Sequence, residues 1–392
     1  MFPASAIGQK KNDLKPVAMS LPFKINPALD TLPVYQPGRP LEEVAREIGL
    51  PVENITKLAS NENPLGPAPT ALAALRLALA QQHLYPDGNA YYLKQELSAR
   101  LNIAAQQLIV GNGSNEIIEF VAHALLDSDA EVVVSQYCFA VYPIVTHLFG
   151  AKLITVPARD YGHDLPAMLN AVTDNTRILF VANPNNPTGT LAPEQDVLNL
   201  IRDLPPHVVL VMDEAYIEFL EDAVDLLPNL RAATSPNLIL MRTFSKIHGL
   251  AGLRVGYGIG HPDFIAALEK VRQPFNLNAL AQTAALAALR DESHQIRTRA
   301  NNDNGKQYLT RSCTELGLNY VPSHANFLLL EVAQGQVVFD ALLQHGIVTR
   351  PMGGYGLPEW IRVSIGTPDQ NAKFISHLRE CLATLTDRPQ QA

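Results

Sequence analysis

The chain has 392 residues, of which 47% are hydrophobic, and it carries a formal net charge of −8. A chain of this length is expected to bury a large core and to divide into two domains. The acidic balance argues against a nucleic-acid partner, so any anionic ligand must be held by local arginines.

Cysteine and histidine usage limits the function further. The three cysteines are scattered, as in a reduced cytosolic protein, and the 11 histidines show no metal-ligand spacing. No apolar stretch approaches the roughly 18 residues of a membrane span. We therefore expect a cytoplasmic protein with neither a metal site nor a membrane partner. Residues 1–24 contain lysines but no signal-peptide core, and we interpret them as a flexible extension with Met19 as an alternative start.

Beyond this extension, helical and strand-like segments alternate along the chain. Periodic apolar residues predict helices at 70–82 and 93–101. The alternation indicates βαβ units and a mainly parallel sheet. The strand-like runs lie at 131–135, 152–156, 178–182, 208–212, 238–242 and 254–259.

The C-terminal part of the chain has a different pattern. From 278 to about 313 it predicts one long helix or two, leading from a large domain into a small one. Short strand-like runs follow at 325–331, 346–350 and 360–364. The small domain is therefore expected to be α+β.

Four motifs carry the chemistry, and the first is a glycine loop. An apolar pair at 109–110 runs into Gly111-Asn112-Gly113-Ser114-Asn115, after which a helical pattern begins. Glycines permit a tight turn, and a helix N-terminus offers free N–H groups and a positive dipole end. The motif indicates a phosphate site, and an ordinary helix cap by Ser114 is the alternative.

The second motif ends a strand-like run with Asn183-Pro184-Asn185-Asn186-Pro187-Thr188-Gly189. Two prolines and a glycine make this a rigid turn, which can present an asparagine amide to a ligand. A turn without a binding role is the alternative.

The third motif places Asp213 at the end of the apolar run 208–212, with Tyr216 three residues later. Open α/β sheets bind ligands at the carboxyl ends of their strands. A buried carboxylate there needs a cationic partner, such as a protonated pyridine nitrogen. An apolar run before Asp-Glu is also typical of nucleotide-triphosphatase metal sites, but the chain has no Gly-x-x-x-x-Gly-Lys-Ser/Thr loop.

The fourth motif is Ser245-Lys246, just past an apolar run, with Arg254 in the Gly-rich stretch that follows. Desolvation lowers the pKa of a lysine at the end of a buried strand, and a neutral amine forms a Schiff base with a carbonyl. Ser245 and Arg254 are suited to hold a phosphate. The glycines between 252 and 260 form no Gly-x-Gly-x-x-Gly run, which argues against a nicotinamide cofactor.

In this order, the four motifs resemble those of fold-type I pyridoxal 5′-phosphate (PLP) aminotransferases, most closely the histidinol-phosphate aminotransferase family. The resemblance extends from about Leu32 over nearly the whole chain. Aromatic amino acid aminotransferases and a threonine-phosphate decarboxylase share most of the same strings and are the alternatives. Further matching strings lie at 32–38, 58–66, 85–88, 139–142 and 360–367.

The resemblance implies a mixed, mainly parallel seven-stranded sheet in the large domain and PLP as the cofactor. Lys246 would carry PLP as a Schiff base and move a proton, while Asp213 would keep the pyridine nitrogen protonated. Asn186 and Tyr216 are expected to bond the phenol oxygen, and Phe139, where the family often has tyrosine, to stack on the ring. The cofactor phosphate is expected to contact Ser114, Asn115, Ser245 and Arg254.

The resemblance also implies a homodimer with shared active sites. Tyr85 is expected to reach the cofactor phosphate of the neighbouring subunit. Arg350 and Arg362 are expected to bind substrate anions. Asn63 is expected in the substrate site, and Tyr35 is expected to close the pocket. The predicted reaction transfers the amino group of histidinol phosphate to 2-oxoglutarate in histidine biosynthesis.

The expected organisation after the extension is an arm at 25–60 that joins the small domain, a large PLP-binding domain at 61–285 and a small domain at 286–392. A PLP-binding regulator without turnover is a further alternative. The intact set of Lys246, Asp213 and Arg362 argues against it.

Overall fold

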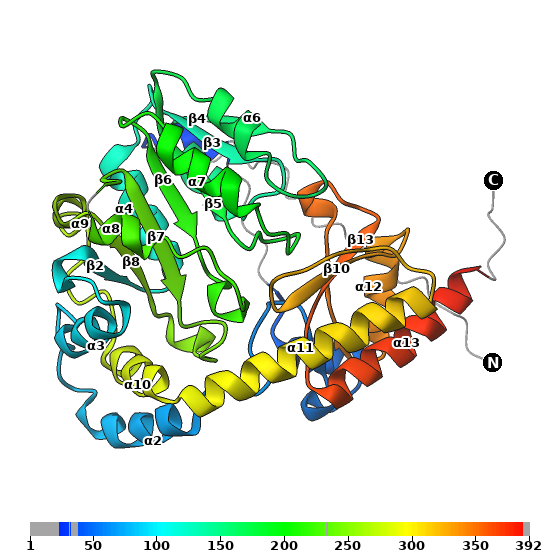
Figure 1. Cartoon of the computed structure of the whole chain (residues 1–392). Coiled ribbons are helices and arrows are strands. Elements are labelled where there is room, and N and C mark those ends of the chain that lie inside the picture. Colours follow the sequence, from blue (N-terminus) through cyan, green and yellow to red (C-terminus); the bar gives the residue numbers. More distant parts are fainter. Residues whose placement is uncertain (1–22, 31, 33–37, 233, 387–392) are drawn as a thin grey trace.

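The computed structural model describes residues 23–30, 32, 38–232 and 234–386 (Figure 1). Residues 1–22, most of the expected extension, and Tyr35 lie outside the described residues. Within the described part, no helix is long and apolar enough to cross a membrane.

A seven-stranded sheet forms the larger half of the molecule, with the order β2-β8-β7-β6-β5-β3-β4. Strand β8 runs antiparallel to both neighbours, and the other pairs are parallel. The predicted mixed, mainly parallel sheet is therefore confirmed. Its strands are β2 Leu108–Gly111, β3 Glu131–Ser135, β4 Lys152–Val156, β5 Thr176–Ala182, β6 Val209–Asp213, β7 Leu238–Thr243 and β8 Gly256–Gly260.

Alternate side chains of these strands enter two separate cores, one on each face of the sheet. On β6, Leu210 and Met212 belong to one core, and Val211 belongs to the other. Because both faces are covered by helices, the central strands read as continuous apolar runs. Helices α2 Pro69–Ala78, α3 Tyr91–Leu101, α6 Leu165–Asn170, α7 Glu194–Asp203, α8 Leu227–Arg231 and α10 Ala279–Arg290 contribute to the first core. Helices α4 Ser114–Leu125, α5 Val141–Leu148 and α9 Pro262–Leu268 contribute to the second.

A smaller antiparallel sheet, in the order β12-β13-β10-β9, forms the C-terminal part. Helices α11 and α13 run side by side along it (Figure 1), and the predicted α+β arrangement is confirmed. The expected strand at 346–350 is divided at Thr349 into β11 and β12, which belong to different sheets. The elements are β9 Tyr320–Val321, β10 Phe327–Glu331, β11 Ile347–Val348, β12 Arg350–Pro351, β13 Trp360–Ser364, α11 Glu292–Glu315, α12 Gly335–Gln344 and α13 Pro368–Thr386.

The N-terminal segment packs with this C-terminal part. Helix α1 Leu41–Ile48 is followed by β1 Thr56–Lys57, which pairs in parallel with β11. Leu58 then enters the core shared by α11, α12 and α13. Short 3₁₀ turns complete the chain at η1 Pro27–Asp30, η2 Val52–Asn54, η3 Leu79–Gln81, η4 Ala105–Gln107, η5 Ile217–Phe219, η6 Ala251–Leu253 and η7 Gly353–Tyr355.

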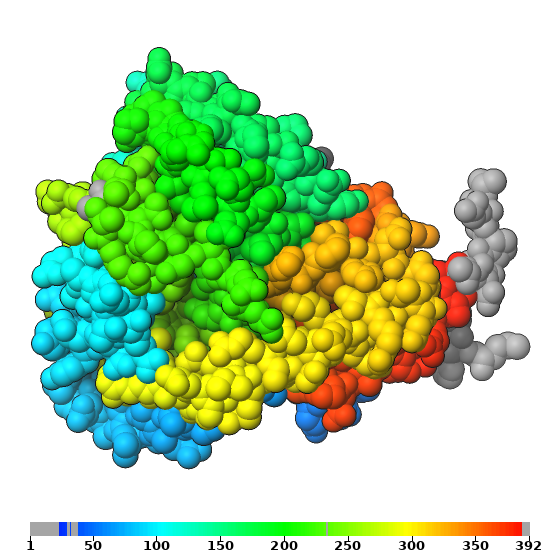
Figure 2. Space-filling view, in the orientation of Figure 1, coloured from blue at the N-terminus to red at the C-terminus, as the bar shows by residue number. Residues whose placement is uncertain are grey.

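The helical region from 278 to 313 consists of two helices that meet at Asp291. Its carboxylate accepts the His294 backbone N–H and the Thr70 hydroxyl, so it caps α11 where α10 ends. The expected domain boundary at 285 falls inside α10, which packs on α2. In Figure 2 the yellow helix region spans from the blue and cyan segments to the orange C-terminal part.

Candidate active site

A pocket of about 250 Å³ lies at the carboxyl ends of β5, β6 and β7. This is where the strand arrangement of an open α/β sheet places ligands. The structure brings nine of the predicted residues together around it, from motifs that are far apart in the sequence. They are Ser114, Asn115, Phe139, Asn186, Asp213, Tyr216, Ser245, Lys246 and Arg254.

The glycine loop brings the N-terminus of α4 to the pocket. Gly113 has φ of +81°, and a Cβ there would lie 2.4 Å from Arg254 Nη2. A Cβ on Gly256 would lie 2.4 Å from the Ser114 backbone nitrogen. Gly113, not Ser114, is the N-cap residue and no side chain caps the helix, so the alternative of a Ser114 cap is wrong. The first N–H groups of α4 therefore remain available to an anion.

Arg254 supplies a cation beside this helix terminus. Its backbone has φ of +55°, and Nη1 donates to the Ala251 carbonyl at 3.1 Å and to Ser245 Oγ at 3.5 Å. A guanidinium, a hydroxyl and a helix N-terminus in one pocket are the groups that proteins use to bind phosphate.

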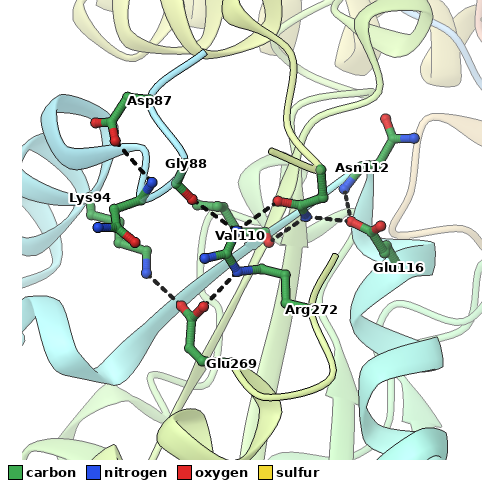
Figure 3. Close-up of polar contacts among 10 residues, drawn as sticks. Asp87, Gly88, Lys94, Val110, Asn112, Glu116, Glu269 and Arg272 are labelled. Carbon is green, nitrogen blue, oxygen red and sulfur yellow. Dashed lines mark hydrogen bonds and ion pairs between the residues drawn. The ribbon is translucent and has the colours of Figure 1, made fainter. Parts of the chain in front are cut away.

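A polar network holds the glycine loop from outside the pocket (Figure 3). Glu116 Oε2 accepts the Asn112 N–H and the Asn276 amide, each at 2.6 Å. Arg272 donates to Asn276 Oδ1 at 2.9 Å and to the Gly88 carbonyl at 2.8 Å. The loop that carries Tyr85 is thereby tied to the glycine loop. Arg272 and Asn276 were not predicted, because they are distant in sequence from the loop they support.

Asp213 is 6% exposed at the end of β6. Its Oδ2 accepts the Tyr142 hydroxyl at 2.7 Å, and its Oδ1 accepts the Ala215 N–H at 3.1 Å. Burial raises the pKa of this carboxyl, and the bonds from Tyr142 and Ala215 oppose that shift. A carboxylate so placed suits a cationic ring nitrogen as its partner. Tyr142 lies in the matching string 139–142, but the sequence indicated no role for it.

Lys246 follows β7 and points its amine into the pocket. Nζ donates to the Ser60 carbonyl at 3.2 Å and lies 5.6 Å from the centre of the Tyr216 ring. Burial, and then the charge of Arg362, lower the pKa of this amine to about 8. The lowered pKa increases the fraction of neutral amine near neutral pH, and the neutral amine is the form that makes a Schiff base.

Tyr216 and Asn186 face the same pocket from two loops. The Tyr216 hydroxyl accepts a bond from Asn61 Nδ2 at 3.0 Å, and burial raises its pKa to about 12. Asn186 Oδ1 accepts a bond from Arg362 Nη1. Asn61 had no predicted role, although it is buried and has a positive φ of 55°, which is uncommon outside glycine.

Arg362 and Arg350 are cross-strand partners in β13 and β12. Directly paired residues of antiparallel strands lie on the same face of the sheet. Arg362 is buried, donates to the Ala59 carbonyl at 3.0 Å and lies over the Phe327 ring. Arg350 lines a neighbouring cavity of about 790 Å³, whose wall is largely apolar and includes Ala59 and Cys138.

Two further predicted site residues, Asn63 and Tyr85, line neither the pocket nor the neighbouring cavity. The Asn63 amide donates to the Ile247 carbonyl at 2.8 Å and to Thr298 Oγ1 at 3.1 Å, and its Oδ1 accepts the Leu65 N–H. These bonds hold the loop that carries Asn63, and the expected contact of Asn63 with the substrate stays a prediction. Tyr85 is 83% exposed and stacks on Phe275, outside the pocket of its own chain.

A group of possible metal ligands also forms, which the sequence spacing did not indicate. The ligand atoms of His345, His377 and Glu380 lie within 4.8 Å of one another, at the end of α12 and on α13. None of the three lines the pocket.

The sequence matches the model of the family "aminotransferase class I and II" over residues 53–378. The chain belongs to the class I and II aminotransferase family. Histidinol-phosphate aminotransferase 1 of Nitrosococcus oceani is 49% identical over 89% of this chain and 94% of its own length. The histidinol-phosphate aminotransferase of Akkermansia muciniphila is 47% identical over 93% of this chain and 100% of its own length.

Solved structures agree with this assignment. The crystal structure of histidinol-phosphate aminotransferase from Sinorhizobium meliloti, in complex with pyridoxal-5′-phosphate, superposes with a TM-score of 0.86. It is 30% identical and covers 94% of this chain and 100% of its own. The aminotransferase fold predicted from the four motifs is thus confirmed.

Proposed function

We propose that this aminotransferase uses PLP and transfers the amino group of histidinol phosphate to 2-oxoglutarate. The observation that carries the proposal is one pocket in which an amine, a buried carboxylate and an anion site surround the same space. The relatives named above, which are histidinol-phosphate aminotransferases, support the choice of substrate.

The donor groups of the pocket fit PLP. The α4 N-terminus, Ser245 and Arg254 would hold the phosphate. Because Gly113 and Gly256 lack Cβ atoms, the Arg254 guanidinium can lie close to Gly113, and the Ser114 backbone nitrogen can lie close to Gly256. Asp213 would pair with the ring nitrogen. When bound, PLP supplies an electron sink for the carbon that loses a proton.

The protein groups around the cofactor would have separate roles in the reaction. Lys246 Nζ takes the proton from the amino-bearing carbon of the donor, because its lowered pKa leaves an unprotonated amine available. Tyr216 and Asn186 would orient the phenol oxygen, and Phe139 would cover one face of the ring. Arg362 already donates to Asn186, so it is placed beside the reacting atoms before a substrate arrives.

Two arginines on one face of the small sheet are suited to an anionic substrate. A doubly charged phosphate is costly to desolvate without cationic partners. Arg350 lines the larger cavity and is paired with Arg362 across β12 and β13. We propose that Arg350 and Arg362 bind first the phosphate of the donor and then, in the second half of the reaction, the carboxylate of 2-oxoglutarate.

The apolar wall of the larger cavity favours one second candidate, an aromatic amino acid aminotransferase. Pro143, Ile144, Phe339 and Leu343 line that cavity together with Arg350. An aromatic donor would place its ring there and would depend mainly on Arg362 for its carboxylate.

The experiment that separates the two donors compares histidinol phosphate with phenylalanine, each with 2-oxoglutarate. We expect the higher kcat/KM for histidinol phosphate. Replacing Arg350 with alanine should raise KM for histidinol phosphate by roughly 10–150-fold, the equivalent of a lost bond to a charged group of ~1.5–3 kcal/mol. The KM for phenylalanine should change far less.

Arg311→Ala on α11 is the matched control, since it removes an exposed arginine outside both cavities. A higher kcat/KM for phenylalanine in the wild type would replace the proposed donor with an aromatic amino acid and leave the cofactor assignment intact.

We further propose a cytoplasmic homodimer in which Tyr85 reaches the partner's cofactor phosphate. The high exposure of Tyr85, Leu77 and Tyr92 on neighbouring segments supports a covering second copy.

We propose a large domain beginning at residue 61 and a small domain after it, with the arm at 25–60 joined to the small one. The break at Asp291 favours that residue over 285 as the boundary.

A further inference from the structure

Tyr142 contacts residues of β5 and β6, two strands that end at the pocket. It lies on α5, is 1% exposed, and donates its hydroxyl to Asp213 Oδ2 at 2.7 Å. Its ring stacks on Phe180 of β5, with centroids 4.4 Å apart and planes 3° from parallel. The ring of Phe139 meets the Tyr142 ring edge-on at 5.7 Å.

The direction of the hydrogen bond follows from the ionisation of the two groups. An ionised carboxylate is only an acceptor, so the phenol must donate. Burial and the charge of Asp213 raise the pKa of Tyr142 well above its usual range, which keeps the phenol protonated. With the Ala215 N–H on the other oxygen, Asp213 receives two donors. Both donors stabilise the ionised form of a carboxylate that burial would otherwise protonate.

We propose that Tyr142 is a positioning residue of the aminotransferase reaction, which fixes Asp213 in the ionised form and in the orientation that pairs with the cofactor's ring nitrogen. The inference rests on the proposed function, because it requires that PLP occupies the pocket. Through its edge contact with Phe139, the same side chain also fixes the aromatic group expected to cover the ring.

The test separates this role from packing. Tyr142→Phe keeps the ring and its stack on Phe180 and removes only the hydroxyl. Tyr257→Phe is the matched control, because Tyr257 is a buried tyrosine of β8 that does not line the pocket. Each variant is measured for PLP dissociation constant, for the pH dependence of the absorption of the bound cofactor, and for kcat and KM.

We expect Tyr142→Phe to lower kcat by roughly 10–150-fold, as for a lost bond to a charged group, with a much smaller change in KM. The pH at which the bound cofactor changes its absorption should move in Tyr142→Phe and stay in place in Tyr257→Phe. In an Asp213→Asn background, the Tyr142→Phe change should have little further effect on that pH.

Equal spectra and equal kcat for Tyr142→Phe and Tyr257→Phe would overturn the positioning role. Failure of the wild type to bind PLP would instead overturn the proposed function, so the two failures are distinguishable. The thermal midpoint of the cofactor-free variants shows whether either substitution merely destabilises the fold.

A different observation, on helices α12 and α13 of the C-terminal part, carries a second inference. His345 directly follows α12, and His377 and Glu380 lie one turn apart on α13. The two imidazole rings stack with centroids 4.5 Å apart, and His377 Nδ1 lies 3.1 Å from Glu380 Oε2. All three ligand atoms lie within 4.8 Å of one another.

We infer that these three side chains form a site for a divalent transition metal such as Zn²⁺. Two imidazoles and one carboxylate are a ligand set that zinc accepts, with ligand distances of about 2.0–2.2 Å and a fourth position left to water. His345 and Glu380 are exposed, so rotation of their side chains can bring the ligand atoms to that spacing. A bound ion would connect the end of α12 to α13.

The test titrates zinc chloride, with no other ligand, into the PLP-loaded enzyme by calorimetry. We expect one equivalent to bind, the thermal midpoint to rise, and the affinity to fall at least tenfold in His377→Ala, as for a lost ligand of ~1.4 kcal/mol or more. His83→Ala, an exposed histidine elsewhere, is the control. Unchanged binding in His377→Ala, or no binding by the wild type, would overturn this site.

Discussion

Lys246 and Asp213 face one pocket, and burial acts on them in opposite directions. Burial lowers the pKa of the Lys246 amine to about 8 and raises the pKa of the Asp213 carboxyl, because both shifts disfavour a charge in a poorly solvated site. Tyr142 and Ala215 oppose the shift at Asp213 by donating hydrogen bonds to it. The lysine becomes a usable base, while the two hydrogen bonds favour the charged form of the carboxylate.

The lowered pKa of Lys246 predicts how cofactor attachment depends on pH. The rate at which PLP attaches to the cofactor-free protein should rise between pH 7 and 9, with a midpoint near 8. Reduction with borohydride followed by peptide mapping measures the attached fraction and locates it. Lys270→Met, which removes an exposed lysine, should leave the profile unchanged. Label on a lysine other than Lys246 would contradict the assignment.

The same shift predicts a pH dependence of stability in the cofactor-free protein. The folded amine has a pKa of about 8 and the unfolded one about 10.5, so between these values the unfolded state binds more protons. Stability contributed by this group therefore rises with pH through that window and is lower below it. The test measures the free energy of unfolding of wild type and Lys246→Met by denaturant across pH 7.5–10.5, a window of about 3 units set by this shift. This free energy should rise more steeply with pH in the wild type. Parallel curves would argue against the lowered pKa.

At the scale of elements, the glycine loop and α4 depend on contacts from outside the pocket. The loop must leave the α4 N–H groups free for an anion, so the Asn112 N–H is bonded by Glu116 instead (Figure 3). Asn276 donates to Glu116 and to the Val110 carbonyl just before the loop. Arg272 bonds Asn276 and the Gly88 carbonyl, and forms an ion pair with Glu269. A phosphate site is thus fixed by residues that never touch the phosphate.

Arg272→Met is expected to weaken PLP binding without removing any cofactor contact. Loss of the guanidinium leaves part-buried acceptors unpaired, at a cost of ~1–3 kcal/mol in the free energy of unfolding. The dissociation constant of PLP should rise severalfold, because the glycine loop is less well fixed. Arg290→Met removes an exposed ion pair with Glu96 and should have little effect on either quantity. Equal PLP affinity in the two variants would show that the network does not support the loop.

At the scale of the whole molecule, the proposed dimer requires each chain to complete the other's site. Tyr85 stacks on Phe275 at the surface, and its loop is tied through Arg272 to the glycine loop of the same chain. The segment that would reach the partner is therefore mechanically connected to the chain's own phosphate site.

Subunit exchange tests this arrangement. Lys246→Ala and Tyr85→Phe subunits are each expected to form weakly active or inactive dimers. In an equal mixture, about half of the dimers are hybrids, and each hybrid has one site with both native residues, so about a quarter of the wild-type activity should return. A mixture no more active than its components would place Tyr85 outside the neighbouring site.

The sequence by itself determined the elements whose pattern is local. Strands β3, β4 and β13 begin and end where the sequence predicts. Strands β3 and β13 are buried along their whole length, whereas β4 is a partly exposed edge strand whose β-branched residues indicate a strand. The strand β2 was not predicted, since its four residues are too short a run to distinguish from a loop. Asp213, Asn186 and Lys246 were predicted because they lie at or just after the ends of strand-like runs.

Only the tertiary structure decided which distant side chains complete those motifs. Tyr142 and Asp213 are 71 residues apart, and Asn61 and Tyr216 are 155 apart, yet both pairs are hydrogen-bonded. The same applies to Asn63, whose amide is used by partners 184 and 235 residues away. No local pattern encodes such pairs, because they depend on how helices and loops pack across the sheet. The sequence therefore indicated the chemistry of the pocket, and the packing decided which groups hold that chemistry in place.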